Sequence, residues 1–163
     1  MGAFPQRQIR GREPSRRRLT GPTWLDCRHI ESVMQLAGQS SLTVWGPQDY
    51  AYFLAHDQGL CLGIFGQTGD LTAYFLSFVV QGDMDIVSLA THPQARRLGI
   101  AERLIREALV APSVERVFLE VAVDNEAAIK LYKKLGFEIT GTRRGYYEQK
   151  RDALVMAWGH SLT

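Results

Sequence analysis

The stretch Asp85-Ile-Val-Ser-Leu-Ala-Thr-His-Pro-Gln-Ala-Arg-Arg-Leu-Gly-Ile-Ala-Glu-Arg-Leu104 determines how the rest of the chain is arranged. Its apolar residues 86–90 predict a short strand that ends at Pro93. Two arginines and Gly99 follow in a loop, and the residues after them have the periodicity of a helix. The N-terminus of a helix presents unpaired N–H groups and the positive end of its dipole, both of which favour phosphate. The stretch therefore predicts a site for an anionic, phosphate-bearing cofactor.

The overall composition is that of one globular domain. The chain has 163 residues, of which 45% are hydrophobic and 22% are charged, which is enough for a substantial core. No apolar run approaches the roughly 20 residues that span a bilayer, so we expect a soluble, cytoplasmic protein without membrane contact. Cys27, Cys61 and four dispersed histidines have neither the spacing of a zinc site nor that of a disulfide framework, so we expect no metal.

Basic residues are concentrated at the beginning of the chain. Residues 1–20 contain six arginines and one glutamate, whereas the remaining residues include 13 basic and 16 acidic ones. An arm with scattered proline and polar residues is more typical of a solvated, disordered segment than of a nucleic-acid-binding one, which is the alternative. We therefore expect a disordered basic arm over residues 1–20 and a single domain over residues 21–163.

Apolar periodicity predicts the elements on both sides of the opening stretch. We expect helices over 24–37 and 48–56, strands over 60–65, 71–80 and 84–90, a helix over 100–109, a strand over 117–123, a helix that begins at Asp124 or Asn125 and ends at Gly136, and closing strands over 137–142 and 153–158. Gly38 is expected to end the first helix, and a polar, tyrosine-containing connection is expected between the last two strands. Such an order of strands and helices favours a mixed α/β sheet.

Four motifs follow one another in the second half of the chain. They are Leu89-Ala-Thr-His-Pro93, Arg96-x-x-Gly99-x-Ala101, the strand residue Glu120, and Asn125-x-x-Ala128-x-x-x-Tyr132. The glycine pattern alone is weak, because small residues often begin helices for packing reasons. In this order and spacing, however, the motifs resemble those of the GNAT acetyltransferase superfamily. The resemblance implies an α/β fold with a mixed, mostly antiparallel central sheet of about six to seven strands, flanked by about four helices.

Three C-terminal segments make the resemblance more specific. Residues 119–137, 143–147 and 152–156 resemble the bacterial ribosomal protein alanine N-acetyltransferases of the RimI type, and the likeness extends over roughly residues 20–158. Members of that family acetylate the α-amino group of a protein N-terminus with acetyl-CoA. The resemblance therefore implies an acetyl-CoA-dependent N-acetyltransferase whose partner is a protein or peptide N-terminus, such as the N-terminal alanine of a ribosomal protein. The alternatives are a small-molecule or lysine N-acetyltransferase on the same fold and a non-catalytic acyl-CoA-binding module.

The resemblance also assigns the cofactor contacts. The backbone along the pantetheine arm is that of Leu89, Ala90 and Thr91, the pyrophosphate loop consists of Arg97, Leu98, Gly99, Ile100, Ala101 and Glu102, and the side chain that holds the cofactor is that of Asn125. Two positions depart from the family pattern, since Ala101 stands where glycine is common and Arg96 where glutamine is common. One change keeps a small residue and the other keeps a polar one, so we expect at most a weaker approach of phosphate.

Glu120 and Tyr132 are the expected catalytic pair. An α-amine with a pKa of about 8 is roughly one-tenth neutral at pH 7, whereas a lysine is neutral only about once in two thousand, so the first substrate needs less help from a base. Glu120, on an otherwise apolar strand, would remove that proton directly or through water, and Tyr132 would protonate the departing thiolate. Without the resemblance, an outward-facing strand residue and a core aromatic are the more common roles for these two residues.

The reaction is expected to be a direct transfer without a covalent enzyme intermediate. A strand N–H near Leu89–Thr91 would stabilise the developing oxyanion, and neither cysteine has a base placed beside it. Tyr146 and Tyr147, together with Arg143 and Arg144, are expected to flank the substrate entrance. Structural packing of a surface hairpin is an equally good interpretation of the two tyrosines.

Overall fold

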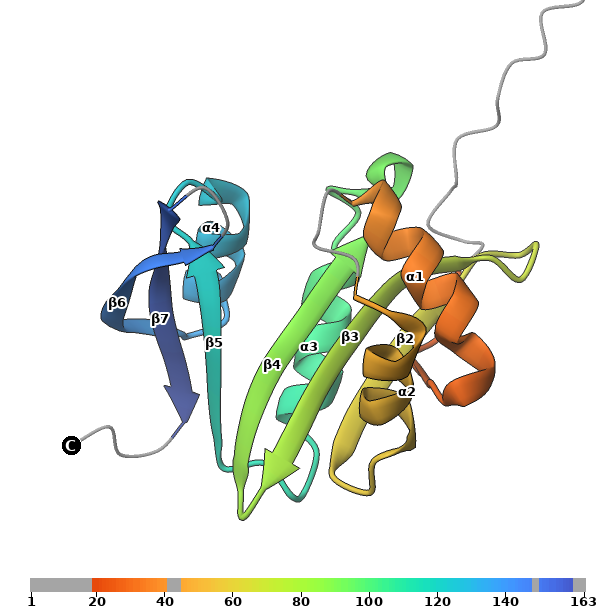
Figure 1. Ribbon diagram of the computed structural model, residues 1–163, viewed down its shortest axis with the longest axis horizontal. Helices are drawn as coiled ribbons and strands as arrows, with labels where there is room; N and C mark the ends of the chain where they lie inside the picture. Colours follow the sequence, from red (N-terminus) through yellow and green to blue (C-terminus); the bar gives the residue numbers. More distant parts are fainter. Residues whose placement is uncertain (1–18, 41–44, 148–149, 160–163) are drawn as a thin grey trace, which may run out of the picture.

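A seven-stranded mixed sheet forms the centre of the molecule (Figure 1). The computed structural model describes residues 19–40, 45–147 and 150–159, so residues 1–18 of the expected arm lie outside the described residues. The strands are β1 (Thr23–Trp24), β2 (Gly59–Phe65), β3 (Leu71–Val80), β4 (Asp83–Thr91), β5 (Arg116–Ala122), β6 (Glu138–Tyr147) and β7 (Arg151–Gly159). The helices are α1 (Ile30–Gln39), α2 (Pro47–Ala55), α3 (Ile100–Leu109) and α4 (Glu126–Lys134), with the short 3-10 helices η2 (Cys27–His29) and η3 (Pro93–Ala95).

The strands lie in the order β1-β2-β3-β4-β5-β7-β6. Every neighbouring pair is antiparallel except β4 and β5, which are parallel and are connected through α3. This arrangement confirms the predicted mixed, mostly antiparallel α/β sheet with its flanking helices. Within the part of the chain that the structure describes, no helix is both long enough and apolar enough to cross a membrane.

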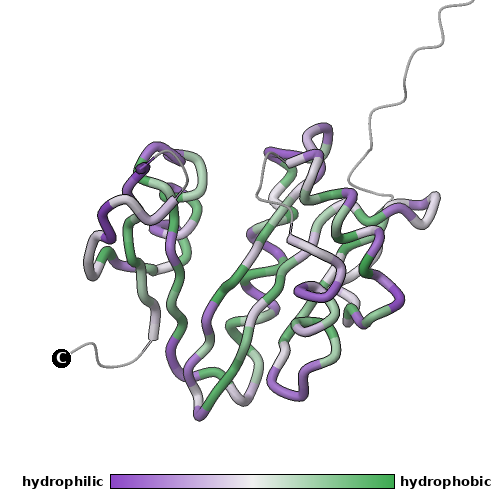
Figure 2. The backbone as a smooth tube through the Cα atoms, in the orientation of Figure 1, coloured by the Kyte–Doolittle hydropathy of each residue, from purple (hydrophilic) through white to green (hydrophobic). Residues whose placement is uncertain are grey.

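Helices cover both faces of the sheet around β3. Figure 1 shows α1 and α2 on one face and α3 on the other. Tyr74 and Leu76 of β3 pack with α1 and α2, whereas Phe75 packs in a second cluster with Leu104 and Ile105 of α3. Because both faces are covered, β3 is apolar along most of its length, which Figure 2 shows as a mostly green strand. The long apolar run therefore reflects burial on two sides.

The pairing of β4 changes at Val87. On the β3 side, Leu76 pairs with Ser88 and Ser77 pairs with Ile86, so that Val87 is an extra residue, a β-bulge. On the β5 side, pairing ends at Ile86. A bulge bends its strand and increases the local twist, and the bulge at Val87 therefore explains why β4 leaves β5 at this point.

Beyond the bulge, β4 and β5 diverge (Figure 1). We refer to Val87–Thr91 of β4 together with Glu120–Ala122 of β5, which are not paired with each other, as the splayed segment. Each strand keeps its outer neighbour, since β4 stays paired with β3 and β5 stays paired with β7. The sheet is consequently open between its two central strands without being interrupted at its edges.

The N-terminal helix differs from its prediction at both ends. The sequence predicts a helix over residues 24–37 that Gly38 ends, but the residues before Ile30 form β1 and η2, and α1 continues through Gly38 to Gln39. The helical periodicity is correct only within α1 itself, where Val33, Leu36 and Ala37 are buried.

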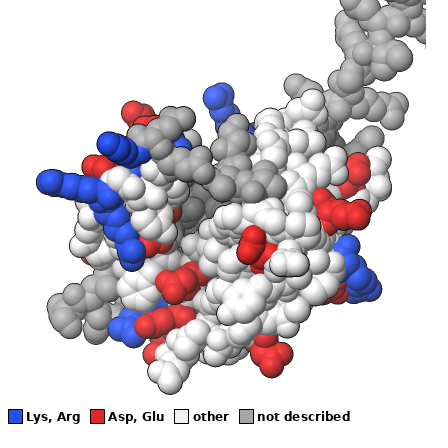
Figure 3. Space-filling model, in the orientation of Figure 1, with Lys and Arg blue, Asp and Glu red and all other residues white. Residues whose placement is uncertain are grey.

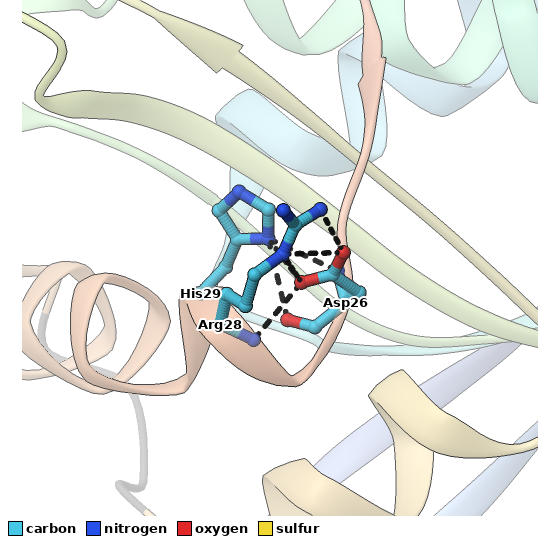
Figure 4. A network of polar contacts seen from close by, with 3 residues as sticks. All are labelled: Asp26, Arg28 and His29. Carbon is cyan, nitrogen blue, oxygen red and sulfur yellow. Dashed lines mark hydrogen bonds and ion pairs between the residues drawn. The ribbon is translucent and has the colours of Figure 1, made fainter.

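A side-chain cap explains the late start of α1 (Figure 4). The backbone N–H of Asp26 donates to Nδ1 of His29 at 3.0 Å, and the Asp26 carboxylate accepts from the backbone N–H of Arg28 at 2.9 Å. The Arg28 guanidinium donates to the same carboxylate at 2.6 Å, and these hydrogen bonds from Arg28 lower the pKa of Asp26 to about 2. Because local side-chain hydrogen bonds of this kind compete with a regular helix, residues 27–29 form a separate 3-10 turn.

The polar connection predicted after residue 142 is also wrong, because β6 continues to Tyr147. Its register against β7 shifts between Arg143 and Tyr147, and Gly145 adopts a φ of +60°. The Gly145 N–H donates to Oδ1 of Asp152 at 2.8 Å, which holds this irregular part. An exposed edge strand needs no alternation of apolar residues, so residues 143–147 carry no period-two signal.

The remaining elements agree closely with their predictions. Helix α3 has the predicted bounds, and β3 does as well. Asn125 is the N-cap of α4, and Gly136 follows its end with a φ of +92°, a conformation that glycine adopts readily.

The buried face of α3 should dominate the stability of the domain. Leu104 is fully buried, so we expect Leu104→Ala to lower the free energy of unfolding by about 2–5 kcal/mol through lost burial and a residual cavity. Val110, at the end of the same helix, is 74% exposed, and Val110→Ala should change the free energy of unfolding by less than about 0.5 kcal/mol. Urea unfolding of both variants measures this difference, and equal losses would contradict the packing described for α3.

Candidate active site

The expected pantetheine contacts lie on the splayed segment. Leu89, Ala90 and Thr91 pair with β3 but have no partner on β5. Of their carbonyls, that of Thr91 accepts from Ser40 Oγ at 3.4 Å and from Arg96 Nε at 3.5 Å. The sheet does not use the remaining backbone groups on the β5 side, and such groups can hydrogen-bond an extended ligand as a further strand would. The segment is therefore suited to an extended ligand, and the role of each residue stays a prediction.

The N-terminus of α3 has the backbone that phosphate binding requires. Gly99 is its N-cap, with a φ of +74° and no side-chain cap, and a Cβ at this position would meet no atom within 4 Å. Arg97 has a φ of +63°, and its side chain is exposed like that of Arg96, whereas Ala101 is half-buried in the first turn. The first N–H groups of α3 thus have no side-chain cap at a place with room for a ligand.

Other residues of the predicted loop direct their side chains elsewhere. Ile100 is buried, and Leu98 packs against the same core cluster. The Glu102 carboxylate accepts from Lys134 at 2.7 Å and from Arg106 at 2.9 Å, and these two donors lower the pKa of Glu102. The side chains of Leu98, Ile100 and Glu102 are therefore not placed to contact a phosphate. Glu102 instead connects α3 to α4.

Glu120 lies on β5 where the splayed segment begins. Its neighbours Leu119 and Val121 are buried in the core, so the alternation of the strand places Glu120 on the opposite face. No described helix covers that face over β5–β7 (Figure 1). The Glu120 side chain is 25% exposed, and its Oε1 forms an ion pair with Nη2 of Arg143 at 3.1 Å. No described residue bonds to Oε2, so one oxygen is held and the other is free.

Tyr132 belongs to the core on the α4 side of the sheet. It is buried in the cluster that includes Leu119 and Val121 of β5, and its ring centroid lies 5.5 Å from that of Phe137. Burial raises the pKa of Tyr132, and the nearby Tyr147 raises it further. No described residue hydrogen-bonds the Tyr132 hydroxyl, which keeps its proton at neutral pH and is available as a donor.

Tyr147 connects the expected catalytic residues. Its hydroxyl donates to the backbone carbonyl of Glu120 at 3.1 Å. Burial raises the pKa of Tyr147, and the charges of Tyr146 and Glu120 raise it further. Tyr147 in turn raises the pKa of Tyr132. Tyr146 is different, since it is 48% exposed and lies beneath the Arg143 guanidinium at 5.6 Å. Tyr147 thus contacts Glu120 and lies near Tyr132, whereas Tyr146 is at the surface.

Asn125 has a structural contact of its own. Its Oδ1 accepts from the backbone N–H of Ala128 at 3.2 Å and caps α4. The cap uses the oxygen and leaves the side-chain NH₂ group without a partner among the described residues. Asn125 can therefore cap the helix and donate to a ligand at the same time, and its predicted cofactor contact is compatible with its position.

Acidic residues gather near the middle of this face (Figure 3). Asp83 forms an ion pair with Arg116 at 2.7 Å. Asp85 pairs with Phe118 of β5 and so shares the face of Glu120. Burial raises the pKa of Asp85 most, and the charge of Asp83 raises it further. The positive charge of Arg143 lowers the same pKa. The face next to Glu120 is therefore suited to a cationic group.

Neither cysteine is placed for nucleophilic catalysis. Cys61 is buried, and burial raises the pKa of its thiol to about 11. Cys27 is exposed on η2, which precedes α1 at the far side of the sheet from β5. A direct transfer is consistent with both positions.

The model of the acetyltransferase (GNAT) family matches residues 30–137. The chain belongs to this family. The expected class, an acetyl-CoA-dependent N-acetyltransferase, is confirmed at the level of the family. In the crystal structure of the ribosomal-protein-S18-alanine N-acetyltransferase from Escherichia coli, the same fold covers 89% of this chain and 96% of that one, with a TM-score of 0.80 and 25% identity.

Two relatives are informative about the length of the match. A Bacillus subtilis protein, named a putative ribosomal protein bS18-alanine N-acetyltransferase, is 29% identical over 131 residues, which cover 78% of this acetyltransferase and 87% of the relative. An N-alpha-acetyltransferase of Sulfurisphaera tokodaii is 45% identical over 76 residues, which cover 44% of this chain and 46% of the relative. The higher identity is thus confined to about half of that protein's length.

One feature of the site was missed by sequence reasoning. Arg143 is predicted to flank the entrance with Arg144, whereas it pairs directly with Glu120. The two residues lie on strands separated by β7, so only the register of three strands brings them together. Arg143 and Tyr147, which both contact Glu120, have an Arg-x-x-x-Tyr spacing in the sequence. This spacing was the one available signal that the two residues act at the same place.

The buried tyrosines of this acetyltransferase predict a loss of stability at high pH. The pKa of Tyr132 is raised above its ordinary value of 10.0, and burial raises that of Tyr74 to about 12. Above pH 10 the folded state therefore keeps protons that the unfolded state releases. The contribution of the buried tyrosines to the free energy of unfolding is complete below pH 10 and is lost as the pH rises above it. Thermal unfolding at pH 9 and pH 11 should show a smaller decrease in Tm for Tyr132→Phe than for the wild type.

The exposed Tyr52 supplies the matched control for this measurement. Tyr52 is 59% exposed, so Tyr52→Phe should retain the wild-type dependence on pH. Identical curves for the wild type and Tyr132→Phe would mean that Tyr132 is not desolvated in the folded protein.

Proposed function

We propose that this acetyltransferase transfers the acetyl group of acetyl-CoA to the N-terminal α-amino group of a protein, and that its substrate is the N-terminal alanine of a ribosomal protein. The observation that supports this activity most directly is the position of Glu120, a carboxylate with one free oxygen where β5 separates from β4. The relatives named as bS18-alanine N-acetyltransferases support the choice of substrate.

The described residues fit acetyl-CoA. The backbone of Leu89–Thr91 has no strand partner on the β5 side, and the first turn of α3 has no side-chain cap beside the exposed Arg97. We assign the pantetheine arm to the backbone of Leu89–Thr91 and the pyrophosphate to the first turn of α3. The Asn125 NH₂ group is a further donor to the cofactor. Acetyl-CoA supplies an activated thioester. A free N–H of Leu89–Thr91 would donate to the thioester carbonyl oxygen, where negative charge develops.

Glu120 acts as the general base in this proposal. Its free Oε2 takes a proton from the substrate amine, directly or through one water molecule. A neutral amine then attacks the thioester carbon directly. The half-buried carboxylate remains accessible, since its face is not covered by a described helix.

Tyr132 acts as the general acid. A phenol is protonated at neutral pH, so Tyr132 can give its proton to the sulfur of CoA as the C–S bond breaks. Tyr147, whose hydroxyl donates to the carbonyl of Glu120, is assigned to the substrate together with Tyr146.

The charge of the site is compatible with an N-terminal amine on a basic peptide. Asp85 shares the face of Glu120, and its carboxylate would attract a cationic group that approaches between the strands. An α-amine is also deprotonated far more easily than a lysine side chain, by roughly two pKa units. A modest base such as Glu120 is therefore better matched to a protein N-terminus.

A peptide panel tests the substrate directly. The purified protein is incubated with acetyl-CoA and with peptides that begin with alanine, in paired forms with a free or a blocked α-amine and with or without an internal lysine. Mass spectrometry of the fragments locates the acetyl group. We expect modification at the α-amine alone, whereas transfer to lysine with no α-amine product would contradict the proposal.

Substitution of the catalytic pair separates chemistry from binding. We expect Glu120→Gln and Tyr132→Phe each to lower kcat by about 10²- to 10⁴-fold, because each removes one proton transfer. CoA affinity, measured by calorimetry, should stay within about twofold of the wild type, since neither residue is assigned to the pantetheine arm or the pyrophosphate. Glu138→Gln alters an exposed glutamate of β6 and should leave kcat unchanged. Full activity of Glu120→Gln would exclude Glu120 as the base.

A further inference from the structure

Two contacts from β6 converge on Glu120. Nη2 of Arg143 lies 3.1 Å from Oε1 of Glu120, and the hydroxyl of Tyr147 donates to the Glu120 backbone carbonyl at 3.1 Å. The first contact fixes the side chain and the second fixes the backbone. Both donors come from the same irregular part of one strand, although β6 is not the neighbour of β5 in the sheet.

Glu120 needs such support because of where it lies. Its strand has lost β4 as a partner at this point, and Glu120 pairs only with Val155 of β7. A glutamate side chain has several rotatable bonds, and an exposed one occupies many rotamers. A general base must present its oxygen to the amine within a few tenths of an ångström, so an unsupported carboxylate would spend little time in the reactive position.

Arg143 is itself held in place. Its guanidinium lies over the ring of Tyr146 at 5.6 Å, a cation–π contact. The bend of β6 at Gly145 is fixed by the hydrogen bond from its N–H to Asp152 Oδ1 at 2.8 Å. Arg143 therefore reaches Glu120 from a supported position. Its neighbour Arg144 is exposed and has no ion pair among the described residues.

We propose that Arg143 is a positioning residue for the general base: it holds Oε1 of Glu120 so that the free Oε2 faces the amine, with Tyr146 supporting the guanidinium. This inference rests on the proposed function of Glu120. It assigns to Arg143 a role that differs from contact with the substrate at the entrance. The effect of Arg143 on catalysis passes through Glu120, and loss of Glu120 should therefore abolish it.

A double-mutant cycle provides the test. We expect Arg143→Gln to lower kcat on an alanine-starting peptide by on the order of 10- to 100-fold, with the KM values for peptide and acetyl-CoA within about twofold of the wild type. In the Glu120→Gln background, Arg143→Gln should cause no further decrease. Arg143→Lys keeps a cation and should restore part of kcat. Arg144→Gln should lower kcat much less than Arg143→Gln does, because only Arg143 forms the ion pair with Glu120.

Three results would overturn the inference. One is a rise in the peptide KM at unchanged kcat, which indicates direct contact with the substrate. Another is a full additional decrease of kcat in the double variant, which indicates action independent of Glu120. The third is an effect of Arg144→Gln equal to that of Arg143→Gln, which indicates only the loss of a nearby charge.

Failure of the proposed function gives a different pattern. In that case the wild type does not acetylate α-amines, or Glu120→Gln keeps its activity. Crystal structures then test the contact without turnover. We expect one Glu120 rotamer against Arg143 in the wild type and several rotamers in Arg143→Gln. A single unchanged Glu120 rotamer in the variant would show that Arg143 does not position it.

Discussion

The β-bulge at Val87 is the constraint on which the rest of the structure depends. One extra residue in β4 ends its pairing with β5 while both strands keep their outer neighbours. The sheet therefore stays continuous at its edges and is open at its centre. Backbone groups of Leu89–Thr91 that a regular sheet would use have no partner on the β5 side. A regular parallel pair at the same place would have satisfied those groups and closed the site.

The chemistry is assembled from both halves of the sheet around this opening. Helix α3 follows β4 and brings an uncapped N-terminus, which suits a pyrophosphate. Strand β5 brings Glu120, and α4 brings Tyr132 from the opposite face. The ion pair of Glu102 with Lys134 connects α3 to α4. The proposed cofactor contacts and the proposed catalytic pair thus come from separate elements of the fold.

Elements with a strong periodicity could be predicted from the sequence, and long-range pairings could not. Helix α3 was predicted with its correct bounds because its apolar and charged residues lie on opposite faces. The late start of α1 depends on the cap at Asp26, a local hydrogen bond that a helical period does not reveal. Nothing in the composition marks Val87 as a bulge, since valine is common in regular strands. The pair of Glu120 and Arg143 requires the register of β5, β7 and β6, which only the folded sheet defines.

Hydrogen–deuterium exchange with and without CoA tests the central claim most directly, because it reports on backbone groups and needs no turnover. The account predicts that CoA slows exchange in peptides that contain residues 88–91 and 99–103, where backbone N–H groups without a partner in the sheet or a side-chain cap would become donors to the cofactor. Exchange in β2, on the other side of β3, should be unchanged. Bound CoA that protects other segments and leaves both of these unprotected would contradict the claim that the opening between β4 and β5 is the cofactor site.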